Sequence, residues 1–196
     1  MMERTSVVSR NTKETEIQIS LNLDGSGKAD IQTGIGFFDH MLNSFARHGF
    51  FDLTVKVKGD LEVDTHHTIE DTGIVLGQAI KQAVGDKKGI VRYGSQILPM
   101  DESLVLCALD LCGRPYLVYD LGLDREKVGD LETEMVREFF YAVSYAAEMN
   151  LHIRQMAGMN NHHIIEAAFK AFAKALDSAV AAELRLTGVL STKGSL

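Results

Sequence analysis

The stretch ETEIQISLNLDGSGKADI, residues 14–31, alternates apolar and polar side chains on both sides of a glycine-rich turn. Such alternation is typical of strands with one buried face, so this stretch predicts two strands. The chain continues with a helical pattern in residues 36–50, an alternating pattern in residues 52–59 and a long helical pattern in residues 66–85. The first part of the chain therefore predicts the order strand, strand, helix, strand, helix.

The second part of the chain repeats this order. Two strands are predicted in residues 101–121, a helix in 132–149, a strand in 150–158 and a helix in 162–184. The turns also correspond, LNLDGSGKA in the first part and LDLCGRPYL in the second, and each last helix begins with two histidines. An internal duplication explains these matches.

The duplication predicts an α+β fold. An antiparallel sheet with two helices on one face gives each half one apolar surface, so the halves are expected to pack about a pseudo-twofold axis. We assign residues 1–92 to the first half and 93–196 to the second. The linker near KKGIVRYGSQ, residues 87–96, is short, which predicts one fused globular domain.

Composition excludes several classes of protein. With 45% hydrophobic and 24% charged residues, the 196-residue chain can bury a core. The net charge of −7 argues against a general nucleic-acid or anionic-membrane surface, which needs a basic face. The sequence has no 18-residue apolar span, and its first residues, MMERTSVV, lack the apolar region expected of a secretory signal. Cys107 and Cys112 lie in an apolar run, so we expect buried thiols and a cytoplasmic protein.

The two histidine pairs, in HHTIED and HHIIEA, each carry a glutamate four residues after the first histidine. Residues i and i+4 share a helix face, so His66 can converge with Glu70, and His162 with Glu166. The second histidine of each pair points about 100° away. Charged helix capping is the simpler explanation of one such motif, but it does not explain the repeat.

Two helices related by a pseudo-twofold axis could share two metal ions. Each ion would take a histidine and a glutamate from one helix and a single histidine from the other. Imidazole with carboxylate suits Mn, Fe or Zn, and the absence of thiolates argues against a structural zinc site. The geometry predicts two ligand sets, one of His66, Glu70 and His163, the other of His162, Glu166 and His67.

The preceding helix of each half offers one further ligand. His40 in FFDHML and Glu138 in VREFFYA occupy matching positions of the repeat. His48 and His152 have no such support from the repeat, and we leave them out of the site.

The sequence resembles the imidazoleglycerol-phosphate dehydratase family over essentially its whole length. The motifs that carry the resemblance are HHTIED, NNHHIIEAAFKAF, FFDHML, RNTKET, DLCGRPYL and STKG. The resemblance implies a duplicated α/β fold and a 24-subunit shell built from trimers. It also implies two Mn²⁺ ions per active site at subunit interfaces. The implied reaction, a step of histidine biosynthesis, dehydrates D-erythro-imidazoleglycerol phosphate to imidazole acetol phosphate.

The resemblance also implies roles for individual residues. Glu138 stands where some members of the family have histidine, and a carboxylate can ligate there. Glu14 matches the active-site glutamate and is expected to contact substrate and transfer a proton, with Glu166 as a second candidate. Ser44 stands where some members have a longer amide. The implied ligands are His40, His67, His162 and Glu166 for one ion, and His66, Glu70, Glu138 and His163 for the other. The implied phosphate-binding residues are Arg92, Arg114, Lys170, Ser191 and Lys193.

The chemistry explains why these residue types would be needed. The C–H bond that must break sits beside an imidazole and is not acidic. Metal ions on both ring nitrogens would convert the ring to an imidazolate, whose electrons can expel the neighbouring hydroxyl. Arginine and lysine contacts to the remote phosphate would fix the orientation of the substrate.

Two other functions fit part of the pattern. A dinuclear metallohydrolase acting on a phosphate ester would release inorganic phosphate, which a dehydratase would not. A metal-storage or metal-stapled shell protein would lack the separate group of phosphate-binding residues.

Overall fold

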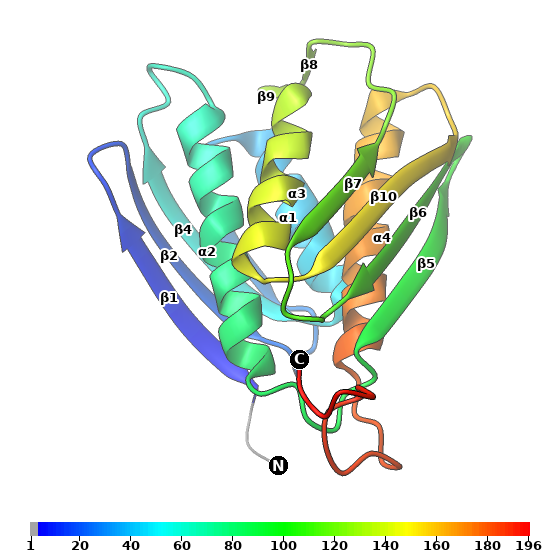
Figure 1. Cartoon of the computed structure of the whole chain (residues 1–196). Helices are drawn as coiled ribbons and strands as arrows, with labels where there is room; N and C mark the ends of the chain where they lie inside the picture. The colour runs from blue at the N-terminus through cyan, green and yellow to red at the C-terminus, as the bar shows by residue number, and fades with distance from the viewer. Residues whose placement is uncertain (1–3) are drawn as a thin grey trace.

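The computed structural model describes residues 4–196 and contains two four-stranded sheets with helices packed between them (Figure 1). The first half comprises β1 (Thr5–Asn11), β2 (Thr15–Asn22), β3 (Ala29–Gln32), α1 (Gly36–Gly49), β4 (Asp52–Gly59) and α2 (His66–Val84). The second half comprises β5 (Tyr93–Met100), β6 (Ser103–Asp110), β7 (Tyr116–Asp120), β8 (Lys127–Val128), β9 (Leu131–Glu132), α3 (Glu134–Ala146), β10 (Asn150–Ala157) and α4 (Asn161–Val180).

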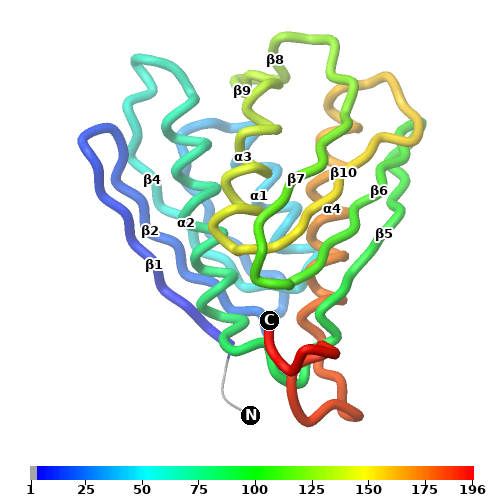
Figure 2. The backbone as a smooth tube through the Cα atoms, viewed as in Figure 1, coloured from blue at the N-terminus to red at the C-terminus, as the bar shows by residue number. Residues whose placement is uncertain are grey.

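The two halves match element for element. Their strand orders are β1-β2-β4-β3 and β5-β6-β10-β7, and only the short β8–β9 hairpin of the second half has no counterpart among the residues described. The predicted α+β class and internal duplication are confirmed. Figure 2 shows the chain passing from the first half to the second at the lower end of α2, after which β5 begins the other sheet.

Two predictions about the sheets were wrong. Each four-stranded sheet has one more strand than expected, β1 and β5, and β5 begins inside the predicted linker. The short β8–β9 hairpin of the second half was not predicted either. Strands β1 and β5 are edge strands with weak apolar patterns, because one side of each is unpaired and residues such as Val7 remain 61% exposed. Each sheet is also mixed rather than antiparallel, since β3 runs parallel to β4 and β7 parallel to β10. In each half a helix connects the parallel pair, as a crossover requires.

The helices pack across the boundary between the halves. In the core, α2 lies against α3, and α1 lies against α4. Gly73 and Gly77 allow α2 to pack closely against α3. A Cβ at Gly77 would lie 2.7 Å from the carbonyl oxygen of Val143 on α3. Cys107 and Cys112 are free and buried, as predicted.

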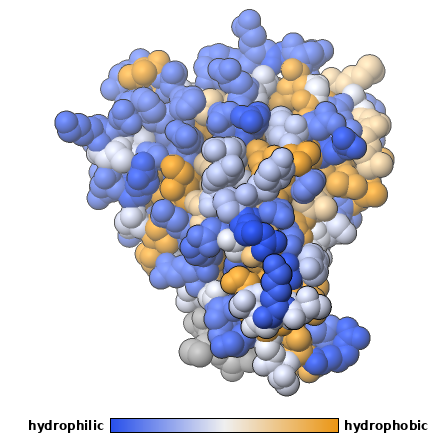
Figure 3. All heavy atoms as spheres, viewed as in Figure 1, coloured by the Kyte–Doolittle hydropathy of each residue, from blue (hydrophilic) through white to orange (hydrophobic). Residues whose placement is uncertain are grey.

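The face of the molecule seen in Figure 3 is mostly polar. Figure 3 shows hydrophilic residues over much of the viewed face, with apolar residues scattered between them. No helix in the described part of the chain is long and apolar enough to cross a membrane.

Candidate active site

All four long helices begin at the same end of the molecule, the upper end in Figure 1. The predicted metal ligands lie in their first two turns. The histidine pairs open α2 and α4, while His40 and Glu138 each occupy the fifth position of α1 and α3. The repeat therefore places all of these side chains at one end of the helix layer.

One group of predicted ligands already comes together within a single chain. The Nε2 atoms of His40 and His162 lie 3.6 and 3.2 Å from Oε2 of Glu166. Ligand atoms of these three residues all fall within 4.8 Å of one another, and they form the one such group among residues 4–196. Two imidazole nitrogens and a carboxylate oxygen at this spacing fit a divalent transition metal.

Glu166 is kept ionised inside this group. The residue is 7% exposed, and burial by itself would raise the pKa of its carboxyl. The ammonium group of Lys170, 2.6 Å from Oε1, acts against burial together with His40 and His162, and the pKa of Glu166 lies below its ordinary value. Glu166 can therefore offer Oε2 to a cation while Oε1 is paired with Lys170.

The pseudo-twofold axis places a second set opposite the first. Nε2 of His66 lies 3.7 Å from Oε2 of Glu70 on α2. Glu138, on the adjacent α3, pairs instead with Nη1 of Arg137 at 2.8 Å. This second set therefore lies on a matching pair of helices, but its side chains do not come together around one point.

Each set draws on both halves of the chain. His40 belongs to the first half and lies beside Glu166 on α4 of the second. Glu138 belongs to the second half, on α3, the helix that packs against α2 of the first. The resemblance already implied that His40 joins His162 and Glu166, and the structure brings these three residues together. The resemblance did not show which helices become neighbours.

The second histidine of each pair is turned towards a different carboxylate. Nδ1 of His67 lies 3.0 Å from Oδ2 of Asp60, and Nδ1 of His163 lies 2.7 Å from Oε2 of Glu102. These contacts raise the pKa of both imidazoles, and the contact with His163 lowers the pKa of Glu102. Nε2 of His67 lies 3.9 Å from Oε1 of Glu14.

One chain does not assemble the four-residue ligand sets. His67 and His163 are not part of the group that comes together within a single chain, and α1 and α3 lie between α2 and α4 (Figure 1). The crosswise sets of the sequence prediction, with His163 beside His66, are likewise not formed within one chain. Their assignment stays a prediction that requires a second chain.

Four of the five expected phosphate-binding residues gather at the opposite end of the molecule. Side chains of Arg92, Arg114, Ser191 and Lys193 line one pocket beside the carboxyl-terminal segment. The Arg92 guanidinium donates to both carboxylate oxygens of Asp110, at 2.7 and 3.0 Å, which fixes it at the pocket wall. Lys170 is not part of this pocket, because it lies beside Glu166.

The length of α4 separates this pocket from the histidines. The backbone N–H of Arg92 donates to the carbonyl of Ala179, near the end of α4. Ala179 lies seventeen residues after His162, so at 1.5 Å per residue the two ends are about 25 Å apart.

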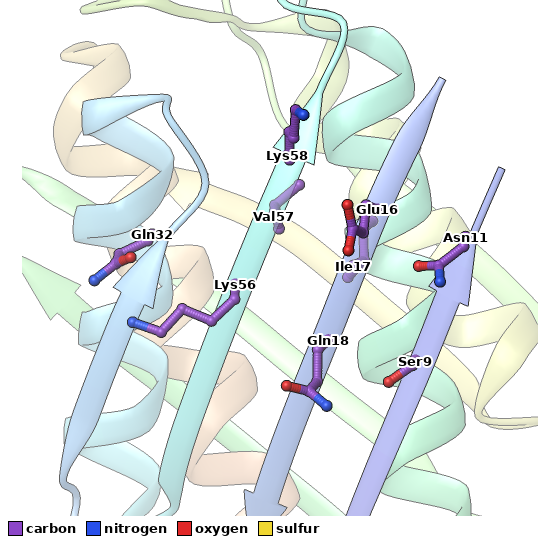
Figure 4. Close-up of a pocket in the computed structure, with 9 residues that line it drawn as sticks. All are labelled: Ser9, Asn11, Glu16, Ile17, Gln18, Gln32, Lys56, Val57 and Lys58. Atoms are coloured by element: carbon purple, nitrogen blue, oxygen red, sulfur yellow. The ribbon is translucent and has the colours of Figure 1, made fainter. Parts of the chain in front are cut away.

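Another pocket lies on the outer face of the first sheet (Figure 4). Polar side chains from neighbouring strands, including Glu16, Gln18 and Lys56, line it. None of the predicted site residues lines this pocket.

Comparison with known proteins identifies the family. The family model for imidazoleglycerol-phosphate dehydratase matches residues 33–176. The chain belongs to the imidazoleglycerol-phosphate dehydratase family. A relative of that name from Lachnoclostridium phytofermentans is 69% identical over 195 residues and covers the full length of both chains.

Solved structures agree with this family. The imidazoleglycerol-phosphate dehydratase of Staphylococcus aureus superposes with a TM-score of 0.82 at 42% identity, over 91% of this chain and 99% of that one. The Pyrococcus furiosus enzyme, solved in complex with (S)-C348, gives 0.84 at 35% identity, over 96% of this chain and 100% of that one. The predicted family, fold and enzyme class, a hydro-lyase of histidine biosynthesis, are confirmed.

The sequence prediction missed two residues beside the dehydratase histidines, Asp60 and Glu102. A signal for Glu102 was present in the repeat, since Glu102 directly precedes β6 as Glu14 directly precedes β2. Asp60 carried no comparable signal, because its contact depends on how the segment between β4 and α2 folds back.

Proposed function

We propose that this dehydratase converts D-erythro-imidazoleglycerol phosphate to imidazole acetol phosphate and water in a site built from more than one chain. The observation that carries the proposal is the separation of about 25 Å between His162 and the pocket beside Arg92. A three-carbon chain joins the imidazole and the phosphate of this substrate, and it cannot span that distance. Histidines from one chain and a phosphate pocket from another can hold a single substrate.

The donor groups fit two Mn²⁺ ions per site. The first ion would be held by His40, His162 and Glu166 with His67 of the partner subunit. The second would be held by the corresponding group of His66, Glu70 and Glu138 with His163 of the partner subunit. When bound, the ions supply Lewis acids that hold the substrate's imidazole ring and stabilise charge developing on it.

Glu14 is the best placed residue to move a proton. Its side chain is 53% exposed, and no hydrogen bond to its carboxylate forms among residues 4–196. Glu166 is a weaker candidate, because Lys170 and the metal would occupy its oxygens. A free carboxylate beside the metal site can accept the proton from the carbon that carries the imidazole.

The remaining basic residues position the substrate. Arg92, already oriented by Asp110, would act with Arg114, Ser191 and Lys193 to hold the phosphate. Lys170 would join them only when the partner subunit brings the two ends together. Binding at the remote phosphate fixes the reacting carbon relative to the catalytic groups.

In a closed assembly, every chain would have neighbours that complete its two partial sites. We propose a 24-subunit shell built from trimers, because each chain carries incomplete sites at opposite ends and can complete those of its neighbours. The two free buried thiols support a cytoplasmic location.

The test is to incubate the Mn²⁺-loaded protein with imidazoleglycerol phosphate and identify the products. We expect the ketone, detected by its absorbance in base, without release of inorganic phosphate. Release of inorganic phosphate without ketone would contradict the proposal and support a metallohydrolase. Retained substrate in the presence of bound Mn²⁺ would exclude both reactions.

A further inference from the structure

Two carboxylates outside the expected ligand sets hold the second histidine of each pair. Glu102 Oε2 lies 2.7 Å from Nδ1 of His163, and Asp60 Oδ2 lies 3.0 Å from Nδ1 of His67. A histidine that donates from Nδ1 to a carboxylate has a fixed ring orientation and keeps Nε2 free to bind a cation. In both halves Nε2 makes no hydrogen bond within residues 4–196, although a second carboxylate lies farther away: Asp101 Oδ2 is 3.6 Å from Nε2 of His163, and Glu14 Oε1 is 3.9 Å from Nε2 of His67.

Glu102 is itself held in place. Its Oε1 accepts hydrogen bonds from the backbone N–H of Asn160 at 2.9 Å and from the hydroxyl of Ser103 at 3.0 Å. These contacts join the turn between β5 and β6 to the residue that caps α4. Because Oε1 is fixed in this way, Oε2 remains directed at His163.

The corresponding residue of the first half behaves differently. Glu14 precedes β2 as Glu102 precedes β6, but its carboxylate lies near Nε2 of His67 rather than Nδ1. It is also more exposed than Glu102, 53% against 38%. Of the two corresponding glutamates, Glu14 thus makes no hydrogen bond through its carboxylate in the described residues, while Glu102 is held by hydrogen bonds and contacts Nδ1 of His163.

Asp60 takes the place of Glu102 in the first half. It follows β4, and its side chain is 17% exposed. Its Oδ1 is buried without a hydrogen-bond partner in residues 4–196, so the contact of Oδ2 with His67 is its principal polar interaction there. The two halves use different strands to hold the same histidine nitrogen.

We infer that Glu102 and Asp60 are positioning residues that orient His163 and His67, so that Nε2 of each faces a bound metal ion. This inference rests on the proposed dinuclear site. Neither carboxylate touches the substrate or the metal, and each acts through its histidine. Because the histidines serve different ions, each carboxylate controls a different one.

The test compares Mn²⁺ binding by the assembled wild-type protein and its variants. In Glu102→Ala, we expect the affinity of one of the two ions to fall about 10- to 100-fold, the usual effect of losing such a partner. Asp60→Ala should weaken the other ion, and anomalous diffraction at limiting Mn²⁺ would show which peak is lost. Glu102→Gln keeps an acceptor for Nδ1 and should lie between wild type and Glu102→Ala.

Glu148→Ala is the matched control, because Glu148 is 40% exposed and ion-paired with Lys81 away from the site. It should bind Mn²⁺ as wild type does. The inference is overturned if Glu102→Ala and Glu102→Gln both keep wild-type affinity at both ions, or if Glu148→Ala loses as much. If wild-type protein binds no Mn²⁺, the proposed function is overturned. This outcome is seen in the wild-type protein alone, so it is distinct from a failure of the inference.

Discussion

At the scale of the residue, one helix presents its two adjacent histidines in different directions. His162 joins Glu166 and His40, whereas His163 turns to Glu102. Neighbouring residues on a helix differ by about 100°, so they cannot share one ion without distortion. In the proposed dinuclear site, the doubled histidine would therefore give each helix one ligand for each ion.

We predict that His162→Ala loses one of the two Mn²⁺ ions and keeps the other. The reason is that His162 belongs to the set with Glu166, while the set with Glu70 is built on other helices. Metal content of the purified assembly would be measured together with anomalous diffraction. His152→Ala, on the exposed side of β10, is the control and should keep both ions. Loss of both ions by a folded His162→Ala protein would contradict separate sites.

At the scale of the element, the close contact of α2 with α3 depends on glycine. In a helix, replacing glycine by alanine usually stabilises, because the unfolded chain loses freedom. At Gly77 the new Cβ would lie 2.7 Å from both Val143 O and Ala146 Cβ, so the helices must move apart. We predict that Gly77→Ala lowers the free energy of unfolding by about 1–3 kcal/mol, measured by denaturant titration. Gly36→Ala, whose Cβ would meet nothing within 4 Å, should not destabilise. Equal effects at the two positions would count against this explanation.

The β8–β9 hairpin is attached to the start of α2 by a carboxylate. Glu132 pairs with Lys127 at 2.7 Å and accepts the hydroxyl hydrogen bond of Thr65, the residue before His66. The ion pair with Lys127, followed by the bond from Thr65, lowers the pKa of Glu132. A lowered folded-state pKa stabilises the protein above the ordinary glutamate pKa, and this stabilisation is lost as the pH falls through the lowered value.

We therefore predict that Glu132→Gln destabilises the protein at neutral pH by less than about 1 kcal/mol, because the pair is partly exposed. The difference from wild type should shrink towards zero in acid. Urea unfolding at neutral pH and at successively lower pH measures it. A difference that stays constant in acid would show that the charge of Glu132 is not responsible.

At the scale of the whole molecule, each chain carries the proposed metal ligands and the proposed phosphate-binding pocket at opposite ends (Figure 1). We predict that His162→Ala and Lys193→Ala, each defective in activity alone, recover partial activity when co-expressed in one assembly. Some active sites would then take His162 from one chain and Lys193 from another. Activity at low substrate concentration, compared with each variant alone, measures the recovery. If the mixture shows only the residual activities of its components, the two residues serve the same site from one chain.

The order of residues was enough to predict the duplication, the histidine–glutamate pairs, the family, and the element order apart from the edge strands and the β8–β9 hairpin. These features depend on local periodicity and spacing, which the order of residues contains directly. Only the folded structure showed that the sheets are mixed and that α1 packs against α4 and α2 against α3. It also showed that Asp60 and Glu102 contact Nδ1 of His67 and His163. It also placed the pocket beside Arg92 about 25 Å from His162. Those relations depend on which apolar surfaces pack together, and residues far apart in the sequence meet only once that packing is complete.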